Sequence, residues 1–159
     1  MSKEKLQIIS SFIVYDNIND LSSEEHLLIL KSKEATKKAY APYSNFHVGA
    51  AILLNNNEIV VGNNQENSAY PSGLCAERVA VFYAGATYPD VIIKCIAINS
   101  LGNQTISPCG SCRQALIEYE HKQKSKIKII LCSEENKIIV SESVANLLPL
   151  QFDASFLKR

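Results

Sequence analysis

Residues 48–62 read VGAAILLNNNEIVVG, which is two apolar runs separated by three asparagines. Asparagine tolerates the positive φ that a tight turn requires, so the run from Asn55 to Asn57 predicts a β-hairpin with strands at 48–54 and 58–62. This pair of strands is the first part of a sheet that the rest of the chain is predicted to extend.

Helices and strands alternate after the hairpin. Their apolar patterns predict strands at 91–99, 126–132 and 137–141, and helices at 75–86, 109–121 and 144–148. Upstream, Ser22 and Glu25 form a capping-box pattern before a helix that Pro42 ends near Ala41. A hairpin followed by this alternation predicts a three-layer α/β/α sandwich around one mixed sheet of about five strands.

The whole chain, residues 1–159, is predicted to be a single domain. Its length is close to that of a usual domain, and no linker or repeat divides it. Ile8, Ser10, Phe12 and Val14 could form one face of a strand, or they could belong to a short helix. Residues 1–20 are treated as an N-terminal extension, because they carry no functional signal.

Composition excludes several classes of protein. Sixteen basic and sixteen acidic residues give a net charge of zero, whereas proteins that bind many phosphates are usually basic. The longest mostly apolar run, 79–86, is much shorter than the roughly 20 residues of a membrane-spanning helix. The start of the chain, MSKEK, is not typical of a signal peptide. We therefore expect a soluble, cytoplasmic protein with no nucleic-acid or membrane partner.

Two of the five cysteines lie within predicted strands and three at predicted helix starts. Cys95 and Cys132 interrupt apolar runs, so we expect both to be buried core residues. Cys109 and Cys112 form a C-x-x-C pair that opens one helix, and Cys75 opens another. Helix N-termini favour thiolates. Three thiolates from two helix starts predict one tetrahedral zinc ion per chain, with one coordination position open.

Other interpretations of these residues remain. The C-x-x-C pair alone could be a redox dithiol, but this leaves Cys75 and Glu77 unexplained. A closed structural zinc site would need a fourth protein ligand. Glu77 could merely complement the dipole of its helix, but a carboxylate beside a zinc-bound water can also carry that water's proton.

The segments CAER at 75–78 and PCGSCRQ at 108–114 together resemble the small, homotetrameric, all-cysteine zinc cytidine deaminases. The resemblance runs from about residue 40 to 152. It includes APYSNFHVGAA at 41–51, NQEN at 64–67, and LLP at 147–149. It implies the three-layer fold and the hydrolysis of cytidine and deoxycytidine to uridine and deoxyuridine, with release of ammonia.

The resemblance also implies residue roles. Glu77 would carry the proton from water to the substrate, while Asn64 and Glu66 would hold the ribose hydroxyls. Phe46 would lie against the nucleoside, and the backbone at Ala76 would meet the pyrimidine carbonyl.

Arg78 would hydrogen-bond the ligand thiolates. Three thiolates and Zn²⁺ sum to one negative charge, and donors to the sulfurs would offset this excess. An ordinary surface ion pair is the alternative for Arg78.

The same resemblance places Tyr70 and Phe152 in a neighbouring subunit's site within a homotetramer. The family's usual Pro-Gly-Ala-Phe ending is Pro149-Leu150-Gln151-Phe152 in this chain, which is a departure from the pattern.

Two alternative functions are compatible with the zinc motif. One is a zinc deaminase of another aminated heterocycle, such as a nucleoside antibiotic, and the ribose-binding pair Asn64 and Glu66 argues against it. The other is a non-catalytic, zinc-stabilised binding module, and the intact Glu77 argues against that.

Overall fold

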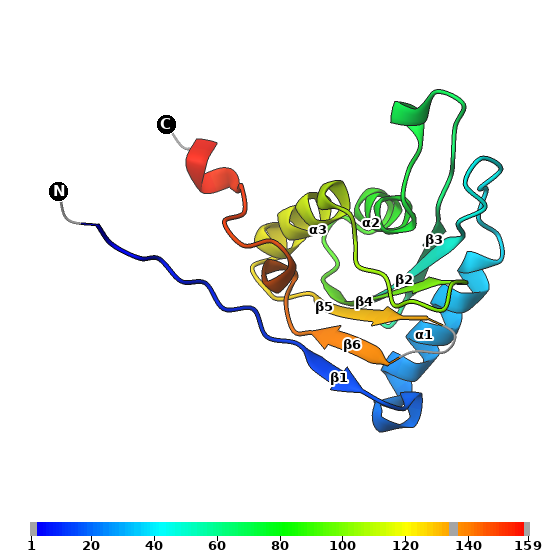
Figure 1. Cartoon of the computed structure of the whole chain (residues 1–159), viewed down its shortest axis with the longest axis horizontal. Coiled ribbons are helices and arrows are strands. Elements are labelled where there is room, and N and C mark those ends of the chain that lie inside the picture. The colour runs from blue at the N-terminus through cyan, green and yellow to red at the C-terminus, as the bar shows by residue number, and fades with distance from the viewer. Residues whose placement is uncertain (1–2, 134–136, 158–159) are drawn as a thin grey trace.

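The computed structural model describes residues 3–133 and 137–157, and it contains one six-stranded sheet with helices on both faces (Figure 1). The strand order is β1-β6-β5-β4-β2-β3. The strands are β1 (Ile13–Tyr15), β2 (Val48–Leu54), β3 (Ile59–Asn63), β4 (Ile93–Ser100), β5 (Lys128–Cys132) and β6 (Ile138–Ser141). Only the β4–β5 pair is parallel among the described strand pairs, so the sheet is mixed, as predicted.

The described part of the chain also contains three α-helices and four short 3₁₀ turns. The helices are α1 (Ser23–Thr36), α2 (Ala76–Thr87) and α3 (Gly110–Gln123). The 3₁₀ turns are η1 (Ile18–Asp20), η2 (Tyr70–Ser72), η3 (Val144–Leu147) and η4 (Ala154–Leu157). In the part of the chain that the structure describes, no helix is long and apolar enough to cross a membrane.

The sixth strand, β1, accounts for the difference from the predicted count of about five. It lies inside the predicted extension, of which residues 1 and 2 are outside the described part of the chain. β1 pairs antiparallel with β6 and places Ile13 opposite Val140. The extension therefore contributes an edge strand to the sheet.

The hairpin from β2 to β3 has the predicted form. Asn57 adopts a φ of 67°, which is the left-handed conformation that asparagine tolerates. Its N–H donates to the Leu54 carbonyl at 3.0 Å, and the Leu54 N–H donates to the Glu58 carbonyl at 3.0 Å. These bonds fix the register of the two strands.

Side chains alternate along β2 between two separate cores. Ala50, Ile52 and Leu54 face α2 and α3, whereas Ala51 and Leu53 face α1. Each face of the sheet is thus covered by helices, which confirms the predicted three-layer sandwich (Figure 1).

Cys95 and Cys132 lie in the core on the α1 side, as predicted. Burial raises the pKa of both thiols, that of Cys132 to about 12. Both cysteines are therefore neutral core residues on the face of the sheet opposite α2 and α3.

The capping box before α1 is present. The Ser22 hydroxyl accepts from the Glu25 N–H at 3.3 Å, and the Glu25 carboxylate accepts from the Ser22 N–H at 3.0 Å. The helix ends at Thr36, five residues before the predicted end near Ala41.

Candidate metal and active site

Three cysteine sulfurs converge where the N-termini of α2 and α3 meet. Cys75 is the N-cap of α2, Cys109 is the N-cap of α3, and Cys112 lies in the first turn of α3. Their Sγ atoms lie within 4.8 Å of one another, with Cys75 and Cys109 3.8 Å apart and Cys109 and Cys112 3.5 Å apart. A tetrahedral ion with Zn–S bonds of about 2.3 Å needs sulfurs about 3.8 Å apart. The donor set and its spacing therefore fit zinc.

The position of Cys75 is set by contacts on both sides of it in the chain. Leu74 and Gln65 exchange two backbone hydrogen bonds of 2.9 Å each. After Cys75, α2 packs closely on β3, because a Cβ on Gly62 would lie 2.6 Å from the Ala76 carbonyl oxygen. Glycine at this position is required by the close approach of the helix that carries the site.

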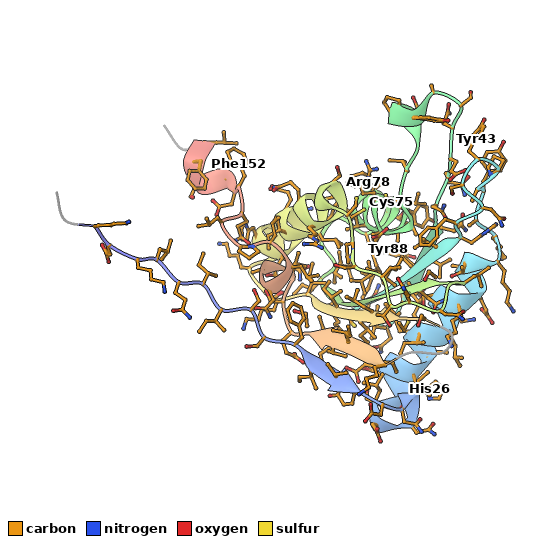
Figure 2. All side chains as sticks on the ribbon, in the orientation of Figure 1. His26, Tyr43, Cys75, Arg78, Tyr88 and Phe152 are labelled. Atoms are coloured by element: carbon orange, nitrogen blue, oxygen red, sulfur yellow. The ribbon has the colours of Figure 1, made fainter. Side chains whose placement is uncertain are left out.

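Arg78 lies beside Cys75 in the first turn of α2 (Figure 2). Its Nη2 donates to Cys75 Sγ at 3.8 Å, as the sequence resemblance implies. Hydrogen bonds from Cys112 and Arg78 lower the pKa of the Cys75 thiol to about 5. The Nε atom of Arg78 is buried without a hydrogen-bond partner among the described residues. The arginine thus favours negative charge on the sulfurs.

Glu77 is nearly fully buried, with 4% of its surface exposed, although it belongs to the first turn of α2. Burial raises its pKa above the ordinary carboxyl value. Its carboxylate does not belong to the group of sulfurs that could hold a metal. Raised pKa values of this kind are typical of carboxyl groups that exchange protons during a reaction.

A cavity of about 530 Å³ opens beside the cysteines. It connects Cys75 and Arg78 with residues for which ribose binding was predicted. Its lining residues are Tyr43, Ser44, Asn64, Gln65, Glu66, Asn67, Tyr70, Gly73, Leu74, Cys75 and Arg78. The structure therefore brings one of the three cysteines, Cys75, to the same pocket as Asn64, Glu66 and Tyr70.

Glu66 is held in place by the loop before β2. Its carboxylate accepts from the Ser44 hydroxyl, from the Tyr43 N–H at 2.8 Å and from the Ser44 N–H at 3.3 Å. These donors, the Ser44 hydroxyl most strongly, lower the pKa of Glu66. Glu66 is thus an oriented, ionised acceptor at the pocket wall, and sequence reasoning assigned no role to the Tyr43–Ser44 pair that orients it.

Asn64 uses both ends of its amide on the backbone of the same loop. Its Oδ1 accepts from the Val48 N–H at 2.8 Å, and its Nδ2 donates to the Phe46 carbonyl at 2.8 Å. Phe46 has a half-exposed side chain and does not line the cavity. Asn64 therefore fixes the backbone that carries Phe46 as well as facing the pocket.

Tyr70 and Phe152 lie apart in a single chain. Tyr70 is 78% exposed and contacts the edge of the Tyr43 ring, with centroids 6.2 Å apart. Phe152 stacks on Phe156 and lies far from Cys75 (Figure 2). Leu150 has a φ of 56°, in the left-handed region that favours glycine, and this is the place of the glycine in the usual family ending.

The sequence of this chain is similar to a family model and to proteins of known name. Residues 22–128 match a family model described as the cytidine and deoxycytidylate deaminase zinc-binding region. Cytidine deaminase from Halalkalibacterium halodurans is 32% identical over 139 residues, which are 82% of this chain and 96% of that protein. Cytidine deaminase from Mycoplasma genitalium is 35% identical over 128 residues, covering 80% and 95%.

The fold of this chain is also similar to a solved structure. The crystal structure of cytidine deaminase from Burkholderia pseudomallei superimposes with a TM-score of 0.72 and 39% sequence identity, covering 80% of this chain and 98% of that one. The match to the family model extends from the N-cap of α1 to the start of β5, and it includes every predicted site residue except Phe152.

Proposed function

The chain belongs to the cytidine and deoxycytidylate deaminase family, and we propose that it hydrolyses cytidine and deoxycytidine to uridine and deoxyuridine, with release of ammonia. The observation that carries this proposal is the group of three cysteine sulfurs beside the buried, non-ligand Glu77. The enzyme is a hydrolase of the C–N bond of a cyclic amidine, and its place is pyrimidine salvage.

Cys75, Cys109 and Cys112 would hold one Zn²⁺ per chain. When bound, zinc lowers the pKa of water and so supplies hydroxide near neutral pH. Three thiolates and a divalent ion leave one negative charge. Arg78 and the N-termini of α2 and α3 offset that charge, because each directs positive charge at the sulfurs.

Glu77 carries the proton through the reaction. It takes the proton from water as the oxygen bonds to C4 of the ring, and delivers it to N3. Glu77 then takes the proton of the new C4 hydroxyl and delivers it to the amine as the C4–N bond breaks, so that ammonia leaves and C4 becomes the carbonyl of the uracil ring. The buried position of Glu77 suits this role, since burial keeps its pKa nearer to neutral than that of an exposed carboxyl group.

The sugar is held in the cavity by Glu66 and Asn64, and Phe46 lies against the nucleoside. Glu66 is supported in this role by its ionised state and by the three donors that orient it. The backbone N–H of Ala76 meets the pyrimidine carbonyl, since N–H groups in the first turn of a helix have no acceptor within the helix.

Turnover of cytidine, deoxycytidine and the free base cytosine tests this proposal. We expect both nucleosides to be deaminated, and kcat/KM for cytosine to be lower by ~10⁴-fold, because polar groups built for a sugar are left unpaired without it. The measurement is the change in ultraviolet absorbance together with ammonia release. Glu66→Gln should reduce the ratio of kcat/KM for cytidine to kcat/KM for cytosine. Glu58→Gln, in the exposed hairpin turn, should leave that ratio unchanged.

Two results would contradict the proposal in different ways. Equal kcat/KM values for cytosine and cytidine would remove the sugar-binding roles of Glu66 and Asn64. Absence of ammonia release from either nucleoside, in protein that holds its zinc, would favour a non-catalytic binding module.

We propose that the enzyme is a homotetramer with Tyr70 and Phe152 at the sites of neighbouring subunits. Support comes from the large apolar side chains that a single chain leaves exposed near its two ends, where the chain projects from the sandwich (Figure 1). They are Leu6, Ile9, Leu150, Phe152, Phe156 and Leu157. Exposed apolar patches of this kind mark interaction surfaces.

Light scattering on an active sample should give a mass about four times the 17.6 kDa of one chain. The expected cause is burial of these side chains between subunits. A single species at 17.6 kDa with full activity would refute the assembly and the interface roles of Tyr70 and Phe152 together.

The cytoplasm is the proposed location. All five cysteines are free, and three of them must stay reduced to bind metal. A reducing compartment meets this requirement.

A further inference from the structure

Cys109 is the metal ligand whose position regular secondary structure explains least. β4 ends at Ser100 and α3 begins at Gly110, and residues 101–109 form neither helix nor strand. Cys109 is exposed, and its side chain makes no capping hydrogen bond to α3. Another group must therefore hold this sulfur at the distance that a metal requires.

Arg113 hydrogen-bonds Cys109 and the two residues before it, Ser107 and Pro108. Its Nη2 donates to the Ser107 hydroxyl at 2.8 Å, and its Nε donates to the Pro108 carbonyl at 2.7 Å. Its backbone N–H donates to the Cys109 carbonyl at 3.0 Å. Arg113 thus connects the irregular segment directly to the first turn of α3.

The fourth hydrogen bond of Arg113 anchors it to η3. Nη1 donates to the Leu147 carbonyl at 2.8 Å, at the end of that 3₁₀ turn. The segment that contains η3 is itself held by Glu120, which follows Arg113 by seven residues and so lies on about the same face of α3. The buried Glu120 carboxylate accepts from the Ser143 hydroxyl at 2.6 Å and from the Val144 N–H at 2.8 Å.

We propose that Arg113 is a positioning residue that fixes Cys109 for metal binding by holding Ser107 and Pro108 against η3. A guanidinium is suited to this task because it is planar and presents its donors in a fixed fork. Arg113 itself is not one of the groups that could hold the metal, and it does not line the cavity beside Cys75. The inference rests on the zinc site of the proposed function.

The test is the rate at which zinc-loaded protein gives up its metal to excess chromogenic chelator. We expect Arg113→Ala and Arg113→Lys both to release zinc ~10- to 100-fold faster than the unmodified protein, as for other outer-shell partners of metal ligands. Lysine keeps the charge but is a single point donor that cannot bridge the three acceptors. Ser107→Ala removes one bond of the set and should give an intermediate rate.

Lys122→Ala is the matched control. Lys122 is a basic residue on the same helix, and its Nζ also donates to a loop carbonyl, that of Pro89 at 3.0 Å. Its replacement should leave zinc release unchanged. Cobalt-substituted protein gives a second readout, since the absorption of thiolate-bound Co²⁺ reports ligand geometry and should differ from the unmodified spectrum in Arg113→Lys.

Three outcomes would overturn the inference. Unchanged zinc release and cobalt spectra in Arg113→Lys would show that the positive charge, and not the fork, matters. If Arg113→Ala does not fold, Ser107→Ala provides the test. Zinc release from Ser107→Ala at the rate of the unmodified protein would exclude a role for the Arg113–Ser107 hydrogen bond. If Lys122→Ala released zinc as fast as Arg113→Ala does, the cause would be a general loss of helix stability and not the loss of the Arg113 contacts. Failure of the unmodified protein to hold zinc would instead contradict the proposed function.

Discussion

Glu77→Gln should lose several powers of ten in kcat while keeping its zinc and its fold. Glutamine has nearly the size and shape of glutamate but cannot carry a proton. General acid–base help from one side chain is worth ~10²–10⁴-fold, and Glu77 serves more than one step of the proposed reaction. The carboxylate is not one of the three groups that could hold the metal, so metal content should be unchanged.

Zinc content, melting temperature and kcat measured on one preparation separate this role from a helix-capping one. If Glu77 only complements the dipole of α2, its replacement should cost about 1 kcal/mol of stability and leave turnover largely intact. Glu24→Gln is the matched control, because Glu24 is an exposed acid in the first turn of α1. Near-normal turnover of Glu77→Gln with full zinc would remove Glu77 from the mechanism.

The layers and most strands could be predicted because their signals are local. Strands β2, β4 and β5 are apolar on both faces, and such runs can be recognised without knowing their partners. β1 could not be predicted with the same certainty. Ile13 and Val14 are both exposed and only Tyr15 packs on the core, so the strand has too little buried surface to produce a pattern, and its pairing with the distant β6 defines it.

The grouping of the three cysteines could be predicted for a similar reason. The C-x-x-C pair and Cys75 each lie at a helix start, and the helix start is itself visible in the sequence. The hydrogen bonds by which Asn64 and Arg113 hold other segments could not be predicted in this way. Their acceptors and donors lie in segments that are adjacent only in the folded chain, such as Val48 for Asn64 and Leu147 for Arg113.

Phe152 shows how a departure from a family pattern limits a prediction. Leucine replaces the usual glycine at position 150, yet the backbone there keeps a positive φ. The conformation of the turn therefore does not depend on glycine. The place of the Phe152 ring beside a second subunit stays a prediction, since in one chain it contacts Phe156.

Cys112→Ala should bind far less than one zinc per chain and should have no measurable turnover. Cys112 is fully buried and belongs to the sulfur group, and the two remaining thiolates would not make the three-ligand site that a catalytic zinc needs. Cys75→Ala and Cys109→Ala should behave in the same way. The measurement is metal analysis after dialysis against a mild chelator.

Cys95→Ala and Cys132→Ala are the matched controls, because each is the same substitution at a buried cysteine on the opposite face of the sheet. Both should keep one zinc and most of their activity, with only the modest destabilisation expected for a small cavity in the core. Loss of zinc from Cys95→Ala together with its retention in Cys109→Ala would show that the metal is bound elsewhere. In that case the group of sulfurs at the starts of α2 and α3 would not be the metal site, and the proposed mechanism would lose its basis.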